Sequence, residues 1–524
     1  MNKLENGKMR EKFCVTMLAF FLPVMALAQS HPVRTQSGLV SGVELSHGLE
    51  VYRGIPFAAP PAGELRWKPP QPAAAWKGVL KADRFGAPCM QKSLPERVGP
   101  WTREFLPQMR SSEDCLYLNI WTAAKRPQTP RPVMVWIYGG GFTSGAGSVA
   151  IYDGTALASQ GVVVVNANYR VGPFGFLAYP GLTEESPHHS SGNYSLLDQI
   201  AALQWVERNI AAFGGDPHQV TIFGQSAGAA SVWMLMQSPL ARGLFERAII
   251  MSGPGLIPSR GITGERPLAD AEKQGQEYAA RLGAQSLKQL RAVPAEKLLE
   301  DSGQARWGPI QDGWVIRAGW HPAHEVPVIN GMVAEDIGIG YYGTEPPPAV
   351  SLADYHKRLE EICGAEASEC EKLYPAKDNQ QAADALRSAL QDRARVSLYK
   401  WGERQAGMSP VVYTYYFNQK VPWPQHPEYG VFHSSELPYM FDNLQLLDRP
   451  WQPVDHRVAR EMSSYWTDFA KTGNPNGKDL PDWPAFKVGD RTTMQIASEM
   501  KPIPLAAPAR EHFWMEHLKT SLGF

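Results

Sequence analysis

The chain has 524 residues, of which 44% are apolar and 20% charged, a composition typical of a soluble globular protein with a large core or several domains. Its 51 Lys and Arg residues nearly balance 52 Asp and Glu residues, which leaves a net charge of -1 at pH 7. A chain so close to neutral has no general attraction for nucleic acid or anionic membranes, so we expect neither as a partner.

The N-terminus predicts a signal peptide over residues 1–28. A basic segment precedes an apolar run at 13–27, which is too short to span a bilayer comfortably. Small residues at Ala26 and Ala28 place the cleavage after Ala28, and a retained anchor is the alternative. No other run of 18 apolar residues follows, so we expect a periplasmic or secreted mature chain without a membrane span.

Four of the five cysteines remain once Cys14 leaves with the signal peptide. An even number in an exported chain predicts disulfides, and four cysteines allow three pairings. The most local pairing joins Cys89 to Cys115 and Cys363 to Cys370, while buried free thiols are the alternative. None of the spacings fits a zinc site.

Strands and helices alternate along the chain, which predicts an α/β fold with a parallel, doubly wound sheet. No Pro-, Gly- or Ser-rich linker divides the chain, so we expect a single domain over residues 29–524. The predicted strands are 38–44, 51–57, 133–138, 162–168, 220–223, 247–251, 326–330 and 411–417. The predicted helical segments are 193–213 with Asn193 as its cap, 263–299, the lobe 352–401, and 454–471.

The pattern Gly-x-Ser-x-Gly at 224–228 follows the strand 220–223, and small helix-forming residues come after it. Strand, sharp turn and helix are the context of a nucleophile elbow, in which the turn lifts the serine hydroxyl clear of the sheet. The sequence therefore makes Ser226 a candidate nucleophile. A serine in an ordinary strand-to-helix turn is the alternative.

Acyl transfer by serine also needs a base, a group that orients the base, and donors for an oxyanion. His433 lies in a loop after the last predicted central strand, where the base must reach the elbow, although position alone also fits an ordinary loop histidine. His456, His512 and His517 lie on predicted helices, where we expect solvated side chains.

The orienting acid should lie just beyond the end of a strand. The strand 326–330 runs on to Glu335 and Asp336, and either carboxylate fits that place, as does a solvated loop pair without a role.

Backbone N–H groups for the oxyanion are expected from the glycines at 139–141 and from Ala227. A phosphate-binding loop at 139–141 is disfavoured, because no Gly-Lys-Ser/Thr follows and no Gly-x-Gly-x-x-Gly opens a helix there. The adjacent His188 and His189 lie in a polar loop and are expected to be solvated, so the sequence predicts neither a metal nor an organic cofactor.

Taken together, these motifs make the sequence similar to the type-B carboxylesterase family of the α/β-hydrolase superfamily, which includes cholinesterases and bacterial para-nitrobenzyl-type esterases. The matching segments run collinearly from about residue 35 to 490. They are Tyr-Arg-Gly-Ile-Pro-Phe-Ala at 52–58, Glu-Asp-Cys-Leu-Tyr-Leu-Asn-Ile-Trp at 113–121, Trp-Ile-Tyr-Gly-Gly-Gly-Phe at 136–142, Asn-Tyr-Arg-Val-Gly at 168–172, Leu-Leu-Asp-Gln at 196–199, Phe-Gly-Gly-Asp-Pro at 213–217, the elbow, the His433 loop at 429–438, and Phe-Ala-Lys-Thr-Gly-Asn-Pro at 469–475.

The resemblance implies a twisted, mostly parallel central sheet with helices on both faces and inserted helical lobes. It implies Ser226 as the nucleophile and His433 as the base. It also implies an oxyanion hole formed by Gly140, Gly141 and Ala227.

The resemblance further implies structural bonds that lie outside the chemistry. These are the disulfide Cys89–Cys115 and the ion pairs Glu113–Arg66 and Asp198–Arg170. The family's second disulfide, soon after the elbow, has no cysteines here, so a Cys363–Cys370 bridge would be a local feature of this chain.

The sequence departs from the family at two places in the site. Gln225 stands where cholinesterases carry Glu, and no tryptophan occupies the position of their choline-binding residue, which puts recognition of a quaternary ammonium group in doubt. Alignment on Gly331 places Asp336 and Ile337 where the family has Glu-Gly, so Asp336 is the expected triad acid and Glu335 the alternative.

We therefore expect an exported serine carboxylesterase that acts on a small-molecule ester through an acyl-enzyme. An amidase or lactone hydrolase with the same machinery, and a catalytically inactive, neuroligin-like binding protein, are the alternatives. The acyl chain, the alcohol and the oligomeric state are left open by the sequence.

Overall fold

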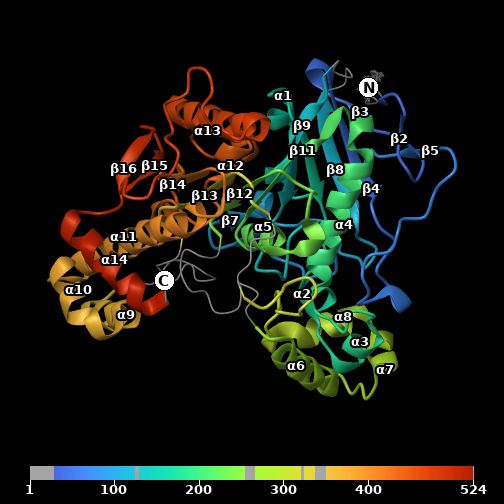
Figure 1. Ribbon diagram of the computed structural model, residues 1–524, viewed down its shortest axis with the longest axis horizontal. Helices are drawn as coiled ribbons and strands as arrows, with labels where there is room; N and C mark the ends of the chain where they lie inside the picture. The colour runs from blue at the N-terminus through green and yellow to red at the C-terminus, as the bar shows by residue number, and fades with distance from the viewer. Residues whose placement is uncertain (1–28, 124–128, 254–265, 320–323, 337–349, 523–524) are drawn as a thin grey trace, which may run out of the picture.

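The fold is organised around an eleven-stranded mixed sheet, shown in Figure 1. The structure is a computed structural model that describes residues 29–123, 129–253, 266–319, 324–336 and 350–522. The predicted signal peptide, residues 1–28, and Ile337 lie outside these described residues. The result is an α/β fold of the α/β-hydrolase type, as the sequence predicted.

The central strands of the sheet are parallel, and their apolar side chains are buried because helices cover both faces. In spatial order the parallel strands are β10 (Val163–Ala167), β9 (Arg131–Ile137), β11 (Gly215–Gln225), β12 (Arg247–Met251), β13 (Val328–Val333), β14 (Val412–Phe417) and β15 (Thr492–Ile496). Antiparallel strands complete both edges: β8 (Tyr117–Ala123), β4 (Leu49–Pro56) and β3 (Val43–Glu44) beside β10, and β16 (Lys501–Pro504) beside β15.

Two further small sheets lie outside the main one. They are formed by β1 (Val33–Arg34), β2 (Leu39–Ser41) and β5 (Val79–Lys81), and by β6 (Arg97–Val98) and β7 (Trp101–Thr102).

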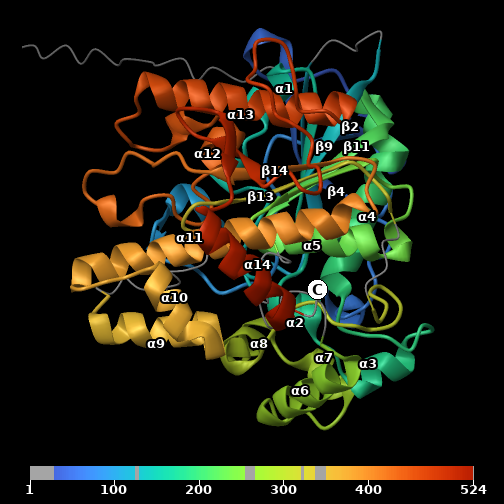
Figure 2. The same ribbon diagram turned by 60° about the vertical axis from the view of Figure 1, so that its left-hand side comes forward.

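Helices pack on the two faces of the sheet, which lies between them in Figure 2. On one face are α1 (Thr155–Ser159) and α13 (Pro453–Thr472), and on the other are α4 (Tyr194–Asn209), α5 (Ala227–Gln237) and α11 (Asn379–Ala406). The amphipathic pattern that predicted helix 454–471 is explained by this packing, because α13 buries Val458, Met462 and Phe469 against the sheet.

The short helix α12 (Leu437–Met440) packs against α13, and the other helices form two groups beside the sheet (Figure 1). One group packs around a separate apolar cluster and comprises α9 (Leu352–Cys363), α10 (Ala367–Leu373), α14 (Pro508–Leu522) and the outer part of α11. The other comprises α2 (Gly172–Phe176), α3 (Pro180–Glu185), α6 (Leu268–Arg281), α7 (Leu287–Ala292) and α8 (Ala295–Glu300). Among the residues that the structure describes, no helix is long and apolar enough to cross a membrane.

Two local expectations were wrong. Asn193 does not cap α4 with its side chain, because its amide binds both the N–H and the carbonyl of Ile310 instead. Nor does β14 end the series of parallel strands: β15 pairs in parallel beyond it. The sequence of β15 is short and begins with two threonines next to a polar turn, so it gave no apolar run to detect.

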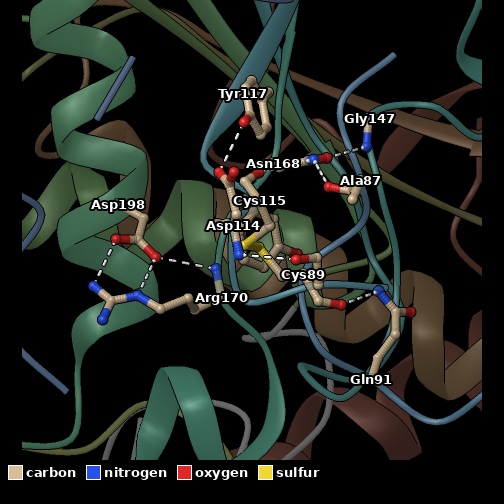
Figure 3. The surroundings of a disulfide bond; sticks show 12 residues. Ala87, Cys89, Gln91, Asp114, Cys115, Tyr117, Gly147, Asn168, Arg170 and Asp198 are labelled. Carbon is tan, nitrogen blue, oxygen red and sulfur yellow. Dashed lines mark hydrogen bonds and ion pairs between the residues drawn. A yellow bond between two sulfur atoms is a disulfide. The ribbon is translucent and has the colours of Figure 1, made fainter. Parts of the chain in front are cut away.

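Both disulfides of the most local pairing are present in the structure. Cys115 lies in the segment that leads into β8, and Figure 3 shows the surroundings of its disulfide with Cys89. Gln91 follows Cys89 by two residues and binds both the N–H and the carbonyl of Gly145. The disulfide therefore anchors a segment that supports the loop after β9.

One buried and one partly buried ion pair also lie in this region. Arg170 binds Asp198 through Nε at 2.8 Å and Nη2 at 2.7 Å, as Figure 3 shows, and Arg66 binds Glu113 at 2.6 Å. Both pairs connect segments far apart in sequence, as the family resemblance implied. Removing one partner of such a pair would leave an uncompensated buried charge.

Candidate active site

The turn between β11 and α5 holds Ser226 in an unusual backbone conformation. Its φ of 59° and ψ of -123° lie in a region that side-chain-bearing residues rarely adopt. A Cβ atom on Gly228 would collide with the carbonyl oxygen of Ile137, so only glycine lets α5 start this close to β9. This strained strand-to-helix turn has the geometry of a nucleophile elbow.

The glycine loop after β9 lies against the elbow. A Cβ atom on Gly139 would lie 3.0 Å from Cβ of Ser226, which shows how closely the two turns approach. Gly140 and Gly141 have φ values of +107° and +63°, which favour glycine. Ala227 is the first residue of α5, so its N–H has no acceptor within the helix. The start of the glycine loop and the start of α5 therefore both lie next to Ser226.

The imidazole of His433 contacts the carboxylate of Asp336. Nδ1 of the imidazole and Oδ1 of the carboxylate form a hydrogen bond, and Asp336 is only 5% exposed. The backbones beside these residues are paired: Glu335 and Phe432 form a parallel bridge, and the N–H of Glu335 donates to the carbonyl of Val431 at 3.2 Å. This bridge brings the loop after β13 close enough for the short Asp side chain to reach the imidazole.

Glu335, the alternative acid, turns away from the imidazole. Its carboxylate pairs with Nε of Arg387 at 3.1 Å and accepts the N–H of Val431, also at 3.1 Å. Burial raises the pKa of Glu335, and the Arg387 charge lowers it in part. The two neighbouring carboxylates therefore have separate surroundings, and only Asp336 contacts His433.

Two further side chains contact His433: Trp101, which the sequence analysis did not single out, and Gln225, which it marked only as a departure from the cholinesterases. The indole N–H of Trp101 donates to the carbonyl oxygen of His433 at 3.1 Å, and the amide nitrogen of Gln225 lies 3.1 Å from its Nε2. Gln225 is the residue immediately before Ser226, so this contact places the imidazole beside the elbow.

A third carboxyl group, that of Glu436, was missed as well. It is fully buried, and neither of its oxygens has a hydrogen-bond partner in another described residue. Burial, and next the charge of Asp336, raise the pKa of Glu436 to about 8. The sequence feature that could have indicated a buried carboxyl group is its position three residues after His433, immediately before an apolar segment.

The pKa of His433 reflects opposing influences. Burial is the largest and lowers it, but the charge and hydrogen bond of Asp336, with a contribution from Glu436, raise it above the ordinary value of 6.5. An imidazole that already carries a proton cannot take another from a nucleophile.

We therefore expect kcat/KM for a neutral ester to fall as the pH drops through a midpoint above 6.5. The measurement is a pH profile with an ester that does not itself ionise between pH 5 and 9. A rate that stays constant down to pH 5 would contradict the assignment of His433 as the base.

The other histidines considered in the sequence lie apart from this group. His456 and His188 are exposed, and His188 stacks on Trp314 with ring centroids 3.8 Å apart. His517 is buried, contrary to expectation: its ring packs against Phe513 and Trp514, and its Nδ1 bonds Glu366 at 2.5 Å. Across the described ranges, no three His, Cys, Asp or Glu side chains are grouped so as to hold a metal ion.

Comparison with known proteins gives a consistent result over almost the whole chain. Residues 29–514 match the sequence profile described as the Carboxylesterase family. The chain is 38% identical over 483 residues to a fumonisin B1 esterase of Sphingopyxis macrogoltabida, with 86% of this chain and 84% of that protein covered. It is 36% identical over 496 residues to a para-nitrobenzyl esterase of Bacillus subtilis, covering 89% and 95%. It is 33% identical over 518 residues to an acetylcholinesterase of Bungarus fasciatus, covering 89% and 83%.

Proposed function

Since the chain belongs to the carboxylesterase family and is an esterase of that family, we propose that it hydrolyses carboxylic esters through an acyl-enzyme on Ser226. The observation that supports this assignment most is the contact between His433 and Asp336 beside the strained Ser226 turn. Ser226, His433 and Asp336 come from three separate segments of the chain, and the contact of Gln225 with the imidazole supports a position of His433 beside Ser226.

In this mechanism the hydroxyl oxygen of Ser226 attacks the ester carbonyl, and Nε2 of His433 takes the hydroxyl proton. Asp336 accepts the Nδ1–H bond, which fixes the imidazole tautomer and stabilises the imidazolium. The negative charge on the former carbonyl oxygen is held by the N–H groups of Gly140, Gly141 and Ala227.

The tetrahedral intermediate then collapses, and the bond to the alcohol oxygen breaks. His433 returns its proton to that oxygen, so the alcohol leaves neutral and the acyl group remains on Ser226. A water molecule repeats the sequence with His433 as base, which releases the acid and restores the serine. No step requires a metal ion or an organic cofactor.

The substrate is a small-molecule ester, and the relatives differ in the substrates that their names state. Gln225 contributes no negative charge beside the imidazole, so we do not expect a preference for esters of quaternary ammonium alcohols. A hydrolysis screen over p-nitrophenyl esters of increasing acyl length, with matched amides and lactones, tests the proposal. Turnover of amides or lactones above that of every ester would reassign the reaction.

We further propose that the protein is exported before it acts. The apolar run at 13–27 and the two disulfides support export, because disulfides persist in oxidising compartments. The mature chain recovered from the periplasm or medium should begin at Gln29, and non-reducing peptide mapping should link Cys89 to Cys115. An intact N-terminus together with a free Cys89 thiol would contradict export.

A further inference from the structure

The side-chain amide of Gln225 is built into the contact between the elbow and the imidazole. Gln225 is only 3% exposed, and its amide nitrogen lies 3.1 Å from Nε2 and 3.5 Å from Nδ1 of His433. On its other side, a Cβ atom on Gly139 would lie 3.3 Å from the amide oxygen. The amide therefore fills the space between the glycine loop and the base.

The two distances also fix how the amide meets the ring. A nitrogen in line with the Nε2 lone pair would lie much farther from Nδ1 than from Nε2, whereas here the distances are nearly equal. The amide nitrogen thus lies over the face of the imidazole, near both ring nitrogens. This contact restricts rotation of the ring without occupying the in-plane direction of the Nε2 lone pair.

The Gln225 amide is uncharged, and this matters because charged groups near His433 affect its pKa. The titratable groups near His433 are Asp336, which is hydrogen-bonded to it, and Glu436. The phenol of Tyr415 is buried close to these two carboxyl groups, and Glu335 is paired with Arg387. Gln225 adds no charge to this set.

We propose that Gln225 is a positioning residue that holds the ring of His433 in place and, being uncharged, sets the pH below which His433 stops acting as a base. This inference rests on the proposed function, because it assigns Gln225 a role only through His433. A carboxylate at the same place would stabilise the imidazolium, since an opposite charge within about 4–6 Å favours the charged form.

The charge part of the inference is tested with Gln225→Glu. We expect the acidic limb of the kcat/KM profile to move upward by about one pH unit or more relative to wild type. The matched control is Gln445→Glu, which adds the same charge at an exposed residue and should leave the limb in place. An unmoved limb in Gln225→Glu, with the variant folded by circular dichroism, would overturn this part.

The positioning part is tested with Gln225→Met, which keeps the side-chain length and removes the amide. Because a misplaced catalytic group costs up to about 100-fold, we expect kcat to fall by about 10- to 100-fold with little change in KM. A wild-type kcat in this variant would overturn the positioning role.

These outcomes are separable from failure of the proposed function. If wild-type turnover depends on Ser226 but both Gln225 variants behave as wild type, only this inference fails. If wild-type turnover persists without Ser226, the proposed mechanism itself fails.

Discussion

Replacing Ser226 with alanine should lower kcat for a p-nitrophenyl ester by on the order of 10⁵-fold or more, because no other group in the site can form the acyl-enzyme. The substitution removes a single oxygen atom at the start of α5, so the thermal unfolding midpoint should change little. Steady-state kinetics and thermal unfolding of the purified variant are the two measurements.

A fluorophosphonate probe provides the second readout for this variant. The probe should label Ser226 and no other serine in the wild-type protein, and labelling should be absent in Ser226→Ala. The control is Ser252→Ala, which changes a buried serine with φ of 52° at the end of β12 and should retain labelling. Unchanged ester turnover in Ser226→Ala would favour a binding protein, with the observed hydrolysis due to a contaminant or another site.

The second large effect is expected from Asp336→Asn, which should lower kcat by about 10⁴-fold with only a small change in KM. Asp336 accepts the Nδ1–H bond of His433, so the carboxylate selects the tautomer whose Nε2 can take a proton. An amide can present its N–H to the imidazole instead, which favours the opposite tautomer and leaves the transition-state imidazolium without a negative partner.

The neighbouring residue supplies the matched control. Glu335→Gln should stay within about tenfold of wild type, because its carboxylate faces Arg387 and the N–H of Val431 and does not contact His433. The same two variants also separate a triad role from a general effect of losing a charge in this loop. A larger loss in Glu335→Gln than in Asp336→Asn would show that the acid is Glu335.

Stability gives a further distinction between the two carboxylates. Glu335 joins the loop after β13 to α11 through Arg387 and to the His433 loop through Val431. We therefore expect Glu335→Gln to act mainly on stability and Asp336→Asn mainly on turnover.

The elbow could be read from the sequence because it is local. A strand, two glycines two residues on either side of a serine, and a helix are contiguous, and each needs only its neighbours to form. The order of strands and helices was likewise readable, since continuous apolar runs mark strands that are buried on both faces. The four mature cysteines allowed three pairings, of which the most local is the one present, and the family resemblance implied its Cys89–Cys115 bridge.

The different surroundings of Glu335 and Asp336 depend on tertiary structure. Both carboxylates follow the same strand, so the sequence alone left two candidates and only a family alignment favoured one of them. In the fold, the bridge between Glu335 and Phe432 aligns two loops almost a hundred residues apart and directs adjacent side chains to different partners. Alternation of side chains along paired backbone segments is the physical reason for this split.

The sequence by itself thus determined the nucleophile turn and the α/β architecture, which depend on residues close together in the chain. Tertiary structure alone brought Gln225 to the imidazole of His433 and buried the carboxyl group of Glu436. Contacts of this kind are set by how separate loops approach over the end of the sheet, and burial then changes the proton affinity of each group. Neither the approach nor the burial leaves a periodic pattern in the sequence.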